Sequence, residues 1–221
     1  LSAIWFGTNN AAREIVSELS IFKRERMFNM DISPYVLSKI SVLAFFSIIQ
    51  SAIFIGILYL RYRSNDLVDY NAPFSAFIWM SFLSIAATFL GLLLSATLAT
   101  AEKVMTIVPI VLIPQIMLAG LVAKINTPYV ELISYLTFTR WGTEGFNAIQ
   151  EKVVISKLNV ASELEDTASN AIEQLKSQFY KTEWFGDWAG TLKLDIIAVF
   201  ILMALMTYFI FKQLKKKVEV L

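Results

Sequence analysis

Four long apolar stretches dominate the sequence. They cover residues 40–60, 72–101, 104–123 and 194–211, and Asp195 is the one charged residue within them. A helix of about 20 apolar residues, within a range of about 17 to 25, is long enough to cross the hydrocarbon core of a bilayer. Helices of soluble proteins are shorter and show a polar face. The pattern therefore predicts four transmembrane helices in an all-α, polytopic membrane bundle.

A different pattern precedes the first apolar stretch. In residues 10–27, apolar side chains recur at helical spacing and charged side chains take most other positions. We expect one amphipathic helix here, with Asn9 or Asn10 capping its start. A helix lying on lipid headgroups is one interpretation. The three glutamates among the basic residues favour the other, which is docking onto a protein of complementary charge.

Basic residues near the span ends predict the orientation. Lysines and arginines precede residue 40 and follow residue 211, and four spans place both regions on one side. The positive-inside rule then predicts that both ends are cytoplasmic. Arg61 and Arg63 lie in the first predicted outer loop and weigh slightly against this orientation. Residues 1–7 are too short to span and are expected to end a helix that begins earlier.

Residues 124–191 are expected to form an insert on the outer side. Within it, residues 129–149 are apolar and aromatic but interrupted by charged residues and glycines, which predicts helices that dip into the membrane. Arg140 and Glu144 are four residues apart and are expected to pair. Residues 162–165 read SELE, a capping box that predicts the start of an amphipathic helix.

Few polar groups interrupt the predicted spans. Pro114 lies beside Gln115 and frees backbone groups that need a neighbouring helix or a polar cavity. Gln115 is either a helix-packing residue or part of a pathway, and for Gln50 packing is preferred. Asp195 lies near the start of the last span, where we expect it to be solvated or paired with Lys193.

Composition excludes several classes of function. The 221 residues are 57% hydrophobic and 17% charged, and contain no cysteine and no histidine. Disulfides, thiolate or imidazole metal sites and the usual catalytic triads are therefore excluded. No phosphate-binding loop motif occurs, so we expect no nucleotide or metal site and no enzyme activity of the chain by itself. A net charge of +1 gives no case for nucleic acid as a partner.

Six motifs stand out along the chain: AAREIVSE at residues 11–18, IFKRER at 21–26, SPYVLSK at 33–39, AGLV at 119–122, FTRWG at 138–142 and GFNAIQ at 145–150. Together they resemble the G-subfamily (white-like) ABC transporters of the ABC-2 permease superfamily. The resemblance is greatest to bacterial members, some of which carry forkhead-associated domains. The order of the motifs matches the family across nearly the whole chain.

The resemblance implies a fold like that of type V exporters and a division of the chain into five segments. Residues 1–9 would be the cytoplasmic end of a truncated helix two, and 10–33 a cytoplasmic coupling helix with its elbow. Residues 34–123 would hold helices three to five, and 124–191 an extracellular insert with a re-entrant hairpin. Residues 192–221 would be helix six and a basic cytoplasmic tail.

The resemblance also implies roles for individual residues. Coupling to an ATPase domain would involve residues of the amphipathic helix, namely Arg13, Glu14, Glu18, Phe22, Arg24 and Glu25. Apolar and amide side chains of helices two and five would line a substrate cavity, namely Phe6, Ile113, Gln115 and Ile116. Leu121 and Val122 would form the outward gate.

These implications define the expected function. The chain would be the permease part of an ATP-driven exporter of an amphipathic or lipid-like molecule, in the inner membrane of a bacterium. Its partners would be a fused or separate nucleotide-binding domain carrying ATP and magnesium, a second membrane domain, and lipid. The alternatives are a non-transporting membrane scaffold and a channel, although a channel requires a continuous polar stripe that the spans lack.

Overall fold

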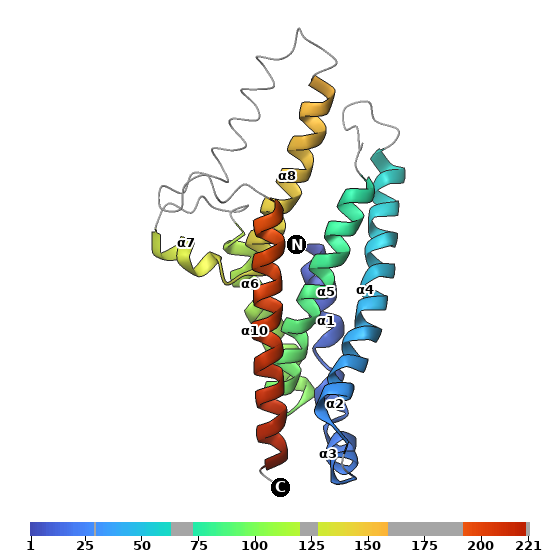
Figure 1. Ribbon diagram of the computed structural model, residues 1–221, viewed down its shortest axis with the longest axis vertical. Coiled ribbons are helices and arrows are strands. Elements are labelled where there is room, and N and C mark those ends of the chain that lie inside the picture. The colour runs from blue at the N-terminus through green and yellow to red at the C-terminus, as the bar shows by residue number, and fades with distance from the viewer. Residues whose placement is uncertain (29, 63–72, 120–127, 159–191, 220–221) are drawn as a thin grey trace.

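The computed structural model describes residues 1–28, 30–62, 73–119, 128–158 and 192–219. Helices are the only regular elements in these ranges, which agrees with the predicted all-α class (Figure 1). The helices are α1 (Ser2–Ala11), α2 (Glu14–Ser17), α3 (Leu19–Met27), α4 (Ile32–Tyr62), α5 (Pro73–Thr97), α6 (Ala101–Met117), α7 (Pro128–Ser134), α8 (Phe138–Leu158) and α10 (Leu192–Glu219).

Three helices are long and apolar enough to cross a membrane. They are α4, α5 and α10, and their spans measure 30, 25 and 26 residues. The fourth predicted span corresponds to α6, which has 17 residues, and its last predicted residues lie outside the described ranges. The structure therefore confirms three of the predicted spans by length and composition.

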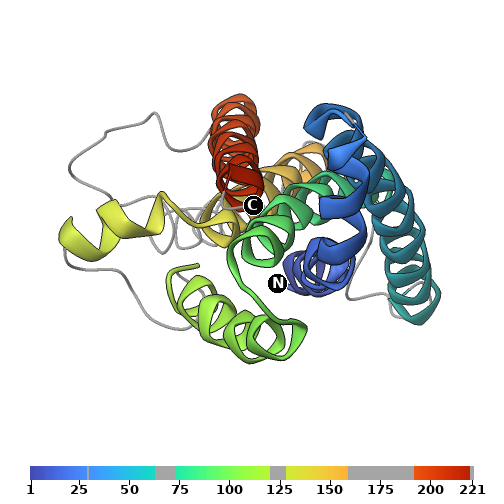
Figure 2. The ribbon, with the colours of Figure 1, turned by 90° about the horizontal axis from the view of Figure 1, so that it is seen from below.

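Helix α5 occupies the centre of the bundle. It packs against α1, α4, α8 and α10, and Figure 2 shows it between its neighbours. In the most apolar 18-residue stretch of α5, 67% of the residues are buried, compared with 22% in the corresponding stretches of α4 and α10. The outer faces of α4 and α10 are apolar and exposed, as expected for surfaces that contact lipid.

Helices α1 and α5 approach each other closely because small residues line their contact. A Cβ atom added at Gly7 would lie 2.1 Å from the carbonyl oxygen of Ser84, and one at Gly91 would lie 2.4 Å from that of Thr8. The Thr8 hydroxyl group also donates to the Ala87 carbonyl at 3.4 Å. Small residues that allow backbones to approach are typical of helix packing in membranes.

Helix α8 is joined to the bundle by hydrogen bonds to backbone carbonyls. The hydroxyl groups of Thr139 and Thr143 donate to the carbonyls of Gln115 and Ala119, at 2.5 and 3.1 Å. These carbonyls lie at the end of α6 and just beyond it, where no further helical turn supplies an N–H donor. The beginning of α8 and the end of α6 are thereby held together.

Candidate functional site

The segment of residues 13–27, called here the charged segment, contains two short helices instead of one. Helix α1 continues through Asn9 and Asn10 to Ala11, so neither asparagine caps the start of α2. Glu18 interrupts the segment, with a φ of −103° and a ψ of 8°, and separates α2 from α3. The prediction of a single amphipathic helix over residues 10–27 is therefore wrong.

A serine from another helix caps α2. The Ser95 side-chain oxygen accepts hydrogen bonds from the backbone N–H groups of Ile15 at 3.0 Å and Val16 at 2.9 Å. Arg13 holds the N-cap position and makes no side-chain capping bond. A capping oxygen normally comes from the N-cap residue itself, whereas here it comes from α5. The contact joins the charged segment to the centre of the bundle.

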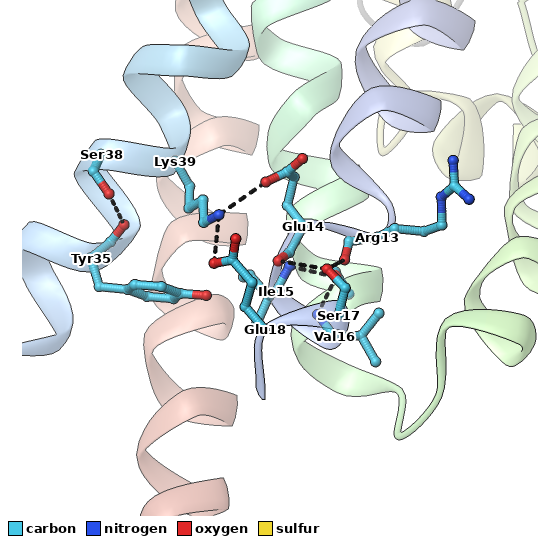
Figure 3. A network of polar contacts seen from close by, with 10 residues as sticks. Arg13, Glu14, Ile15, Val16, Ser17, Glu18, Tyr35, Ser38 and Lys39 are labelled. Carbon is cyan, nitrogen blue, oxygen red and sulfur yellow. Dashed lines mark hydrogen bonds and ion pairs between the residues drawn. The ribbon is translucent and has the colours of Figure 1, made fainter. Parts of the chain in front are cut away.

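A lysine of α4 binds two carboxylates of the charged segment. The Lys39 ammonium lies 3.0 Å from a Glu14 carboxylate oxygen and 2.6 Å from one of Glu18, and Figure 3 shows it between them. The lysine side chain is 17% exposed, whereas the glutamates are 38% and 42% exposed. Lys39 thus joins α4 to both α2 and the residue that separates α2 from α3.

The remaining predicted coupling residues fall into two groups. Arg13, Arg24 and Glu25 are exposed, and Figure 3 shows the Arg13 side chain pointing away from Lys39. Phe22 is 1% exposed, and its ring packs on that of Tyr35 with centroids 4.6 Å apart. Phe22 therefore stabilises the contact of α3 with α4, whereas Arg13, Arg24 and Glu25 are on the exposed surface of the charged segment.

A second candidate site is a cavity of about 310 Å³ between α1 and α6. Three of the four predicted cavity residues line it, namely Phe6, Gln115 and Ile116. Ile113 is absent from this lining and is 55% exposed. The Gln115 residue is 7% exposed, and its side-chain oxygen has no hydrogen-bond partner among the described residues. The cavity is mostly apolar, and its polar lining residues are Gln115, Ser2 and Thr139.

The other glutamine links two helices. The Asn10 amide group donates to the Gln50 side-chain oxygen at 2.7 Å, joining α1 to α4. This contact agrees with the packing role preferred for Gln50. The predicted gate residues Leu121 and Val122, and the capping box at residues 162–165, lie outside the described residues.

A buried group of charged side chains connects α8 and α10. Arg140 and Glu144 pair at 2.5 Å, as their spacing predicts, and the Asp195 carboxyl group lies next to that of Glu144. Asp195 is 1% exposed, whereas Lys193 is exposed. The expectation that Asp195 is solvated or paired with Lys193 is therefore wrong, because α8 covers this part of α10.

The charged residues do not form a metal site in the part of the chain that the structure describes. No group of three histidine, cysteine or acidic residues there could hold a metal ion. The two candidate sites are the charged segment, with its ion pairs and capping bonds, and the mostly apolar cavity between α1 and α6.

Comparisons with known proteins identify the family of the chain. Residues 1–150 match the family described as ABC-2 type transporter. The chain is also similar to the ABC transporter ATP-binding/permease protein Rv1747 of Mycobacterium tuberculosis (strain ATCC 25618 / H37Rv). The two are 25% identical over 146 residues, which cover 64% of this chain and 17% of the relative. The chain thus spans a small part of the length of that protein.

Proposed function

Since the chain belongs to the ABC-2 type transporter family, we propose that this permease domain exports an amphipathic or lipid-like molecule, driven by a nucleotide-binding domain. That domain, fused or separate, would bind ATP and magnesium, because this chain has no phosphate-binding loop. The mycobacterial relative, whose name includes both an ATP-binding and a permease part, supports such a combination.

The charged segment is the observation that carries this proposal. It exposes Arg13, Arg24 and Glu25 while its inner side is tied to α4 by Lys39 and to α5 by Ser95. The exposed side of the charged segment carries charges that a docked domain could bind, and its inner side is bonded to α4 and α5. A displacement of the docked domain could therefore be transmitted to these membrane helices. Glu18, half-buried beside Lys39, would lie at the edge of this surface.

The cavity supports the proposed substrate class. Its lining comes from the beginning of α1, from Leu112, Gln115 and Ile116 of α6, and from Thr139. Relative movement of α1 and α6 would open or close it, and a second membrane domain facing these helices would complete the pathway. Leu121 and Val122 would close the pathway outward, and residues 124–191 would form the extracellular insert with its re-entrant hairpin.

The membrane arrangement follows from the same proposal. Residues 1–9 would end a transmembrane helix, and 10–33 would lie in the cytoplasm with the basic tail of residues 192–221. Residues 34–123 would hold three spans, of which α4 and α5 have the required length and apolar composition. The membrane would be the inner membrane of a bacterium.

Reversing the charge of Glu18 tests the proposed coupling. We expect Glu18→Arg to uncouple transport from ATP hydrolysis, because the new cation lies beside Lys39 and repels any basic group of the docked domain. The measurement is ATP-dependent transfer of a nitrobenzoxadiazole-labelled phospholipid by the complete transporter in vesicles, together with its ATPase rate. Expression should stay at the parental level.

Glu102→Arg is the matched control, because Glu102 is an exposed glutamate in the first turn of α6 and takes no part in the ion pairs of Lys39. It should leave the ratio of transfer to hydrolysis unchanged. Normal transfer in Glu18→Arg would count heavily against the coupling role. A parental protein that transfers no labelled lipid would contradict the lipid-like substrate, and one without any associated ATPase would favour the scaffold alternative.

A further inference from the structure

The charged segment is attached to the bundle by two contacts of different strength. At Lys39 the contact consists of ion pairs with carboxylates that are 38% and 42% exposed, so water and salt weaken it. At Ser95 it consists of two hydrogen bonds to backbone N–H groups, and the serine is 0% exposed. The contact at Ser95 is therefore the more rigid of the two.

The Ser95 contact is rigid on both sides. On one side it holds backbone groups of Ile15 and Val16, which are themselves 0% and 8% exposed. On the other side it belongs to α5, which packs tightly on α1 through Gly7 and Gly91. A displacement of α2 must therefore either move α5 and α1 together or leave two buried N–H groups without an acceptor, which is costly.

We propose that Ser95 is a positioning residue for transport, which passes the displacement of the charged segment to α5 and α1 as one unit. This inference rests on the proposed function, because it requires an ATP-driven displacement. Since α1 supplies much of the cavity lining, the contact at Ser95 connects the docking surface to the cavity. Lys39 attaches the same segment to α4 more loosely.

Ser95→Ala tests the proposal, with Ser84→Ala as the matched control. Both serines lie on α5 and are 0% exposed, but the Ser84 hydroxyl has no hydrogen-bond partner among the described residues. The reporter is a single cysteine, Ser2→Cys in the cavity lining, in the complete transporter with any other cysteines replaced. Its labelling rate by a maleimide is measured with and without ATP and vanadate.

We expect Ser95→Ala to keep the parental ATPase rate and to lower the thermal midpoint only slightly, while the ATP-dependent change in labelling falls about five-fold, the factor that corresponds to one lost helix cap. A residue that only stabilises the fold would instead lower the thermal midpoint and hydrolysis together. Ser84→Ala should retain the full change in labelling. An undiminished change in Ser95→Ala would overturn the inference.

A cross-linking measurement separates this inference from the proposed function. A photoreactive maleimide is attached to a cysteine introduced by Arg24→Cys, an exposed position of α3. If it captures the nucleotide-binding domain in the parental transporter while Ser95→Ala leaves the labelling change intact, the positioning role fails and the proposed function stands. If it captures no such domain in the parental transporter, the proposed function itself fails.

Discussion

Replacing Gly7 with alanine is expected to prevent stable packing of α1 on α5. The added Cβ atom would lie 2.1 Å from the backbone carbonyl oxygen of Ser84 and 2.9 Å from the Ala87 side chain. A backbone carbonyl cannot relieve the clash by changing rotamer, as a flexible side chain can, so the two helices must separate. Overpacking of a rigid contact costs about 1–3 kcal/mol, and a clash with backbone belongs at the upper end or above.

The measurement is the thermal midpoint of the complete transporter in detergent, followed by fluorescence-detected size exclusion. Gly56→Ala is the matched control, because a Cβ atom at this helical position would meet no atom within 4 Å. Its stability should stay unchanged or rise slightly, since alanine favours the helical state by about 0.5–1 kcal/mol. Equal midpoints for Gly7→Ala and Gly56→Ala would contradict the close α1–α5 contact.

The fold class could be predicted because it depends on the length of the apolar stretches in the sequence. Long apolar stretches identified α4, α5 and α10, and no knowledge of their neighbours was needed. The partners of each helix could not be predicted in this way. Gly7 and Gly91 lie far apart in the sequence, and only the folded chain shows that each one makes room for a carbonyl of the other helix.

The charged segment shows why local periodicity alone was insufficient. The spacing of apolar residues over 10–27 predicted one helix. In the structure α2 begins after Arg13, and Glu18 separates it from α3. The capping oxygen comes from Ser95, about 80 residues away. Serines are common near the ends of apolar stretches, so the sequence alone could not identify Ser95 as the cap of another helix.

The cavity was predicted in part, for a geometrical reason. Leu112, Gln115 and Ile116 are spaced by three and four residues, so they share one face of α6 and line the cavity. Ile113 follows Leu112 directly and is rotated about 100° from it, which places it on the exposed face. The choice of residues followed a family resemblance, and the helical period alone does not exclude Ile113, which is three residues from Ile116.

Arg140→Ala is expected to lower stability strongly, because it leaves a buried acidic pair without its cation. The carboxyl groups of Glu144 and Asp195 are each 1% exposed, and the Arg140 guanidinium lies 2.5 Å from that of Glu144. Removing one partner of a buried ion pair costs about 3–5 kcal/mol, whereas breaking an exposed pair costs at most about 1 kcal/mol. The thermal midpoint in detergent measures the loss.

Two further variants test whether the stability loss of Arg140→Ala is caused by the unpaired buried charge. Asp31→Ala breaks the exposed pair of Arg26 and Asp31, whose charged atoms are 3.8 Å apart, and should change the midpoint little. The triple variant Arg140→Met, Glu144→Leu and Asp195→Asn removes all three charges of the buried cluster and nearly keeps its volume, so it should be more stable than Arg140→Ala alone. A triple variant less stable than Arg140→Ala would show that the cluster acts through packing. In that case the guanidinium would not be what permits two carboxyl groups to be buried between α8 and α10.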